Sequence, residues 1–216
     1  MPLPAGGSVS ALLDGHAGAR AGFVLAHGAG AGMDHPFLAA IAEGLAQRGI
    51  AVLRFQFPYV EQGSRRPDPP AVAQAAVRAA VAHAAALWPG LPLFAGGKSF
   101  GGRMTSQAQA VQALPGVRGL AFLGFPLHLA GKPSITRAAH LADVDLPMLF
   151  LQGTRDALAE LPLVRDAIAR LGGRATLHVV DGADHAFHVL VRSGRTDAHV
   201  RAELLHTLAA WIADRA

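Results

Sequence analysis

Short apolar runs alternate along the chain with longer segments rich in alanine and leucine. The short runs are almost continuously hydrophobic and are bounded by glycine or proline, a pattern typical of strands buried in a parallel sheet. Such runs predict strands at 22–27, 50–57, 91–96, 119–125, 147–153 and 175–182. The segment 8–14 is a candidate edge strand.

The longer segments between these runs predict helices. They cover residues 36–47, 70–87, 100–114, 161–171 and 198–213. Strands that alternate with helices indicate an α/β fold with a mostly parallel central sheet and helices on both faces. No internal repeat or linker divides the chain, so we expect residues 1–216 to form one domain, with 62–70 as a long connection inside it.

The amino-acid composition excludes several kinds of reactive group and partner. The absence of cysteine excludes a disulfide framework, a thiolate nucleophile and a cysteine-based metal site, and it fits a cytoplasmic location. The 19 basic residues exceed the 15 acidic ones but are scattered, so we expect no nucleic-acid partner. We expect neither a signal peptide nor a membrane span, because the N-terminus lacks an apolar core and the apolar runs are short.

The stretch FAGGKSFGGRM, residues 94–104, matches two motifs that share Ser99. A phosphate-binding P-loop would need a glycine at position 92, where the chain has Pro92, which has no backbone N–H to offer. The alternative, G-x-S-x-G, is a nucleophile elbow, in which a strand, a sharp turn and a helix follow one another at once. The predicted strand before Ser99 and the predicted helix after it favour the elbow.

An elbow serine needs a histidine to take its proton and an acid to orient that histidine. Asp156 and His185 each follow a later predicted strand, in the order Ser, Asp, His that this class of fold uses. His188 is the alternative base, and His185 is preferred because it comes first after the strand.

Other acidic residues fit less well as the orienting acid. Asp143 and Asp145 precede a strand and should lie at the opposite edge of the sheet, whereas Asp181 and Asp184 are too close to His185 in sequence.

Acyl transfer also needs backbone N–H groups that stabilise an oxyanion. We expect one from Phe100, directly after the serine, and one from Ala29 in the glycine-rich loop after the first parallel strand, with Gly30 as the alternative. His27 is expected to hold this loop by hydrogen bonding. The histidines show no metal-ligand spacing, so no metal or other cofactor is expected.

The motifs HGAG, GGKSFGGRM, QGTRD and GADHAFH, in this order, resemble those of the α/β-hydrolase superfamily over nearly the whole chain. The chain looks closest to the small dienelactone-hydrolase-like branch. Its lysine-bearing elbow is similar to that of the group related to a testis-expressed protein and a subunit of a chromatin acetylation complex. The resemblance implies a triad of Ser99, Asp156 and His185, with Ala29 and Phe100 at the oxyanion hole. Dienelactone hydrolases proper use a cysteine, so dienelactone is not the expected substrate.

Only about twenty residues separate the strand ending near Phe125 from the next one, too few for a cap domain. We therefore expect an open site for a small-molecule acyl substrate. Candidate substrate-binding residues are Tyr59, Arg65, Lys98 and Leu127.

The predicted function is a cofactor-independent serine hydrolase that cleaves a carboxylic ester or related acyl bond. The alternatives are a catalytically silent interaction module of the same fold and an acyltransferase that uses the same triad.

Overall fold

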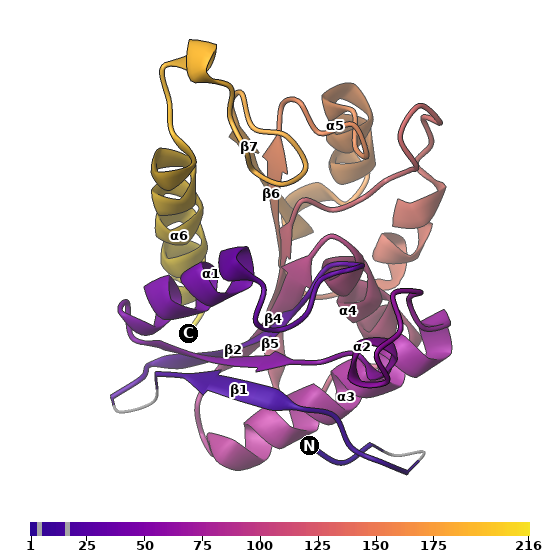
Figure 1. Ribbon diagram of the computed structural model, residues 1–216, viewed down its shortest axis with the longest axis vertical. Coiled ribbons are helices and arrows are strands. Elements are labelled where there is room, and N and C mark those ends of the chain that lie inside the picture. Colours follow the sequence, from indigo (N-terminus) through magenta and orange to yellow (C-terminus); the bar gives the residue numbers. More distant parts are fainter. Residues whose placement is uncertain (4–5, 16–17) are drawn as a thin grey trace.

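Seven strands form a single sheet in the computed structural model, which describes residues 1–3, 6–15 and 18–216 (Figure 1). Their order across the sheet is β1-β3-β2-β4-β5-β6-β7, and β1 alone runs antiparallel to its neighbour. The strands are β1 (Ala11–Asp14), β2 (Ala21–Ala26), β3 (Ile50–Phe55), β4 (Leu93–Lys98), β5 (Val117–Leu123), β6 (Met148–Gly153) and β7 (Ala175–Val180). The predicted parallel sheet and its edge strand are confirmed.

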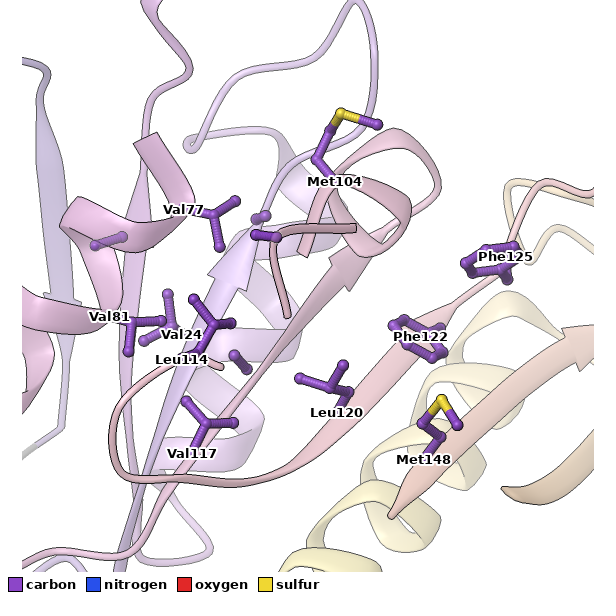
Figure 2. Packing of buried hydrophobic residues seen from close by; sticks show 14 of the residues in the cluster. Val24, Val77, Val81, Met104, Leu114, Val117, Leu120, Phe122, Phe125 and Met148 are labelled. Carbon is purple, nitrogen blue, oxygen red and sulfur yellow. The ribbon is translucent and has the colours of Figure 1, made fainter. Parts of the chain in front are cut away.

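Helices cover both faces of the sheet. α1 (Pro36–Ala46) and α6 (Asp197–Ala213) pack on one face, and α3 (Pro70–Leu87), α4 (Phe100–Val111) and α5 (Leu161–Ala169) pack on the other. Figure 2 shows residues of the second of these layers, in which Val77 and Val81 of α3 and Met104 of α4 belong to one buried cluster with side chains of the sheet. Burial of these two apolar layers is the main stabilising contribution to the fold.

The connections contain short helices that the sequence did not indicate. α2 (Pro58–Glu61) lies between the predicted strand 50–57 and the predicted connection 62–70, and it begins at a proline, which suits the first turn of a helix. Three 3₁₀ helices follow, η1 (Thr136–Asp143), η2 (Gly172–Arg174) and η3 (Val191–Ser193). The connection between β5 and β6 contains η1 and no separate cap domain in the described residues, as predicted.

α3 is apolar enough, with 18 residues and a mean hydropathy of 1.2, to meet the length and composition of a membrane-spanning helix. Its alanines and valines supply one layer of the core described above. Arg78, on the same helix, donates hydrogen bonds to the backbone oxygens of Ala108 (2.6 Å) and Gln112 (2.9 Å) at the end of α4. One side of α3 is therefore buried by its packing on the sheet and on α4.

The order of the strands determines where loops from distant parts of the sequence meet. β3 and β4 pair with opposite sides of β2, so the chain direction across the sheet reverses at β2. Ligands in open parallel sheets bind at such a reversal, outside the carboxyl ends of the strands. Residues 27–35, after β2, and Ser99, after β4, lie at this point.

The close packing of β4 on β5 leads to a prediction about stability. A Cβ added to Gly96 would stand 1.8 Å from the backbone oxygen of Ala121, a contact that only movement of a strand relieves. We expect Gly96→Ala to lower the free energy of unfolding by about 3 kcal/mol. Gly173→Ala is the control, because a Cβ there meets nothing within 4 Å. Urea denaturation of both variants measures the difference, and equal stabilities would contradict the packing described.

Candidate active site

Ser99 occupies the one-residue turn between β4 and α4. Its backbone has φ 50° and ψ −113°, a conformation that residues other than glycine rarely adopt. The backbone N–H of Ser99 donates to the oxygen of Leu123 at the end of β5, with an N···O distance of 3.1 Å. The strained turn raises the serine side chain above the sheet edge, as in a nucleophile elbow.

The two glycines of G-x-S-x-G allow the elbow to lie against the end of β2. A Cβ on Gly97 would stand 2.3 Å from the oxygen of Ala26, and one on Gly101 would stand 2.5 Å from the oxygen of His27. Both approaches are closer than any real Cβ contact, and both are to backbone atoms. Glycine is therefore required by contact with a neighbouring strand at both positions, in addition to the tight turn itself.

The structure brings Ser99, His185 and Asp156 into one hydrogen-bonded chain. His185 Nε2 lies 2.8 Å from Ser99 Oγ, and Nδ1 lies 2.7 Å from Asp156 Oδ2. A carboxylate only accepts, so Nδ1 carries the proton and Nε2 is free to accept from the serine hydroxyl. The Asp156 side chain is buried, and the His185 side chain is partly exposed.

Asp156 is held by groups from its own strand and loop. Its Oδ1 accepts the N–H of Leu158 at 2.8 Å, and its Oδ2 also accepts from the side-chain amide of Gln152. Gln152 Oε1 accepts in turn from the backbone N–H of Phe125 at 3.0 Å. Sequence analysis missed Gln152, although a lone polar residue near the end of the apolar strand 147–153 was a usable signal.

Asp184, considered and rejected as the orienting acid, shapes the loop that carries His185. Its Oδ1 accepts the N–H groups of Ala186 (2.8 Å) and His188 (2.9 Å). Phe187 lies within this turn with φ 64°, and its ring is buried. The loop is therefore closed on itself beside the imidazole.

The glycine-rich loop after β2 is fixed by buried polar side chains. His27 donates from Nδ1 to the oxygen of Gly28 (2.8 Å) and accepts the N–H of Phe57 at Nε2 (3.0 Å), in agreement with its predicted structural role. The Tyr59 hydroxyl accepts the N–H of Gly30 at 3.2 Å. Of the two candidate oxyanion donors, Gly30 thus has its N–H engaged by the protein.

The far end of the same loop is tied to β3. Gln56 Oε1 accepts the N–H of Met33 at 2.8 Å, and Arg54 donates to the Met33 oxygen at 2.7 Å. Arg54 also makes a bidentate pair with Asp14 of β1, at 2.8 and 2.9 Å. Neither Arg54 nor Gln56 was anticipated as a support of the site.

A pocket of about 340 Å³ opens beside the serine. It is lined by Gly28, Ala29, Ala31, His35, Phe37, Leu38, Lys98, Ser99, Leu158, His185 and Ala186. Of the four candidate substrate-binding residues, Lys98 alone belongs to this lining. The pocket thus combines the reactive groups with small and apolar walls.

The other three candidates lie elsewhere. Tyr59 is buried behind the glycine-rich loop, because α2 turns its ring toward the core, and Leu127 is buried in the core as well. Arg65 is exposed in the connection after α2 and does not line the pocket. These positions do not support direct contact with a substrate in the pocket.

His188, the alternative base, points away from the serine. Its Nδ1 pairs with Asp197 at 2.9 Å, and this pair raises the pKa of His188. His35 is also placed by local structure, since its ring caps α1 by accepting the N–H of Phe37 at 3.3 Å.

The family whose description is an alpha/beta hydrolase domain matches residues 19–213. The chain belongs to this family. Among solved structures, an alpha-beta serine hydrolase homologue from Coxiella burnetii superposes with a TM-score of 0.78 at 21% identity, covering 96% of this chain and 95% of the other.

Two further structures share the fold of this hydrolase. A serine hydrolase without a lid from Xanthomonas campestris gives a TM-score of 0.74 at 24% identity, covering 98% of this chain and 93% of that one. A dienelactone hydrolase from Anabaena variabilis gives 0.74 at 21% identity, covering 96% and 92%. The predicted likeness to lidless, dienelactone-hydrolase-like proteins is confirmed at the level of fold, while the likeness to the testis-expressed group stays a prediction.

The buried His27 makes stability depend on pH. Burial lowers the pKa of His27 below its ordinary value of 6.5, so between the two values the unfolded chain binds a proton that the folded chain does not. The free energy of unfolding is therefore expected to fall as the pH drops below 6.5, by up to about 1.4 kcal/mol per pH unit from this residue.

Urea titrations between pH 7 and pH 5 on the wild type and His27→Gln measure this dependence. The slope should be smaller in His27→Gln and unchanged in His206→Gln, which alters an exposed histidine. A slope that is the same in all three proteins would show that His27 does not contribute.

Proposed function

We propose that this alpha/beta hydrolase is a cofactor-independent serine hydrolase that cleaves carboxylic esters of small acyl groups through an acyl-enzyme. The observation that carries the proposal is the chain of hydrogen bonds from Ser99 through His185 to Asp156, at 2.8 and 2.7 Å. Family membership supports hydrolase chemistry. The description of a further fold relative, an esterase domain from Rhodothermus marinus at 18% identity and a TM-score of 0.72, is consistent with ester substrates.

Acylation starts when Ser99 Oγ attacks the ester carbonyl and His185 Nε2 takes the hydroxyl proton. Asp156 stays ionised, keeps the proton on Nδ1 and stabilises the imidazolium that forms. The imidazolium then gives its proton to the leaving alcohol, and the acyl group remains on Ser99. Water attacks this acyl-enzyme with His185 as base, which releases the acid and restores the serine.

The oxyanion of each tetrahedral intermediate needs donors that are not already engaged. In the part of the chain that the structure describes, neither the Ala29 N–H nor the Phe100 N–H donates a hydrogen bond to the protein. Phe100 begins α4, so its N–H lies at the positive end of the helix dipole. These two groups are the proposed oxyanion hole.

Removal of the serine hydroxyl should abolish turnover without harming the fold. We expect Ser99→Ala to lower kcat/KM for p-nitrophenyl acetate by at least about 10³-fold and to prevent labelling by a fluorophosphonate probe. His188→Ala is the matched control, because it removes a histidine near His185 that pairs with Asp197 and not with Ser99. This variant should keep both the ester turnover and the labelling by the probe. Urea denaturation would verify that both variants remain folded.

Each contrary result identifies a different function. A folded wild-type protein that neither labels nor turns over short esters would instead be an interaction module of this fold. Labelling with little hydrolysis, but with transfer to added alcohols or amines, would identify an acyltransferase. Activity that persists in Ser99→Ala would exclude the serine mechanism.

The size of the pocket leads to a second prediction. A pocket of about 340 Å³ beside the serine, closed by no cap domain in the described residues, suits a short acyl chain and leaves a long one in water. We expect kcat/KM for p-nitrophenyl acetate or butyrate to exceed that for the laurate by at least about tenfold. Assays below the critical micelle concentration measure this ratio. A preference for laurate would show that the acyl chain binds outside this pocket.

A further inference from the structure

Lys98 immediately precedes the nucleophile, and an elbow does not require a lysine there. Its side chain passes the glycine-rich loop, with Cγ 3.5 Å from the position of a Cβ on Gly28. Although the stem of the residue lines the pocket, its Nζ is buried and has no hydrogen-bond partner among the described residues. Burial of an ammonium without a partner is costly, which calls for a functional reason.

The surroundings of Nζ link it to the Asp156–His185 pair. The position of a Cβ on Gly124 lies 3.1 Å from Nζ and 3.5 Å from both Cε1 and Nδ1 of His185, so the ammonium and the ring flank the same point. The Phe187 ring is a further neighbour, with its centroid 5.5 Å from Nζ. Gly124 has φ 72°, a backbone conformation that strains any residue with a side chain.

The charged and titratable groups around Lys98 come from two loops. Asp156 follows β6, and Asp184 and His185 follow β7. Burial disfavours the protonated form of Lys98 and is the larger effect, whereas the two carboxylates favour that form. A positive charge here stabilises the ionised Asp156 and disfavours a second positive charge on the adjacent ring.

We propose that Lys98 is a positioning residue that acts through the Asp156–His185 pair: its buried ammonium opposes protonation of His185 and so extends activity to lower pH. The inference rests on the proposed function, because it concerns the general base of that reaction. No contact between Nζ and substrate is involved, since Nζ is covered by protein.

The charge of Lys98 itself depends on pH. Burial lowers the pKa of Lys98 to about 8, so the ammonium is present below that pH and is lost above it. The influence of Lys98 on His185 should therefore be confined to the acidic and neutral range. This limit distinguishes an electrostatic role from a role in packing, which would act at every pH.

The first experiment compares pH profiles of kcat/KM for p-nitrophenyl acetate. In Lys98→Met, the acidic limb should move up by about one pH unit, with activity on that limb lower by about tenfold, and the profiles should converge above pH 8. Lys132→Met is the matched control, because the chain has only two lysines and Lys132 is exposed. A uniform loss at all pH values, or an acidic limb that does not move, would overturn the proposal.

The second experiment does not depend on turnover, so it separates this inference from the proposed esterase. The wild type and Lys98→Met are followed by NMR, with the ring resonances of His185 assigned by their loss in His185→Gln. The titration of His185 should move to higher pH by about one unit in Lys98→Met and stay unchanged in Lys132→Met. An unmoved titration in a folded Lys98→Met protein would overturn the proposal even if esterase activity were found.

Stability provides a check on the same variant. Because the uncompensated buried charge is removed, Lys98→Met should unfold at a higher urea concentration than the wild type at pH 7, and at pH 10 the difference should shrink. A lower midpoint in Lys98→Met would indicate that Lys98 serves packing, contrary to the proposal.

Discussion

The contact between the elbow and the end of β2 is the constraint on which the rest of the site depends. Gly97 and Gly101 lie directly against the backbone oxygens of Ala26 and His27, with no space for a side chain at either glycine. This contact fixes the start of α4 relative to the loop after β2. The nucleophile and the proposed oxyanion donors are therefore positioned by backbone, which moves less than side chains do.

Around this contact, Asp156, His185 and Ser99 are each held by separate hydrogen bonds or strand contacts. Asp156 is bonded to Gln152 and to the N–H of Leu158, and the loop of His185 is closed by Asp184. The backbone of Ser99 is strained, and it persists because neighbouring strands hold both sides of the turn. Hydrogen bonds within the protein thus hold the serine, histidine and aspartate in line.

The sequence predicts those features of the fold and site that depend on residues close together along the chain. The strands, the elbow at Ser99 and the order of Asp156 and His185 depend on short apolar runs and on residues that directly follow them. The placement of Tyr59 could not be predicted in this way, because α2 is only four residues long and turns the ring inward.

The supporting residues were missed for a related reason. Gln152 bonds Phe125, 27 positions away, and Arg54 bonds Asp14, 40 positions away. These partners come together only when the strands pair. The sequence can therefore mark Gln152 as an unusual polar residue in an apolar strand, but it cannot identify the group that Gln152 bonds.

The pair between Arg54 and Asp14 has a consequence for the edge of the sheet. β1 covers the outer side of β3, which would otherwise present unpaired backbone groups to other chains. The same arginine continues inward to the oxygen of Met33, at the far end of the loop that bears Ala29. The N-terminal strand thus covers the edge of the sheet and, through Arg54, supports the loop that carries Ala29. A change in β1 that breaks the Asp14–Arg54 pair would therefore disturb the loop that carries Ala29 as well as the edge of the sheet.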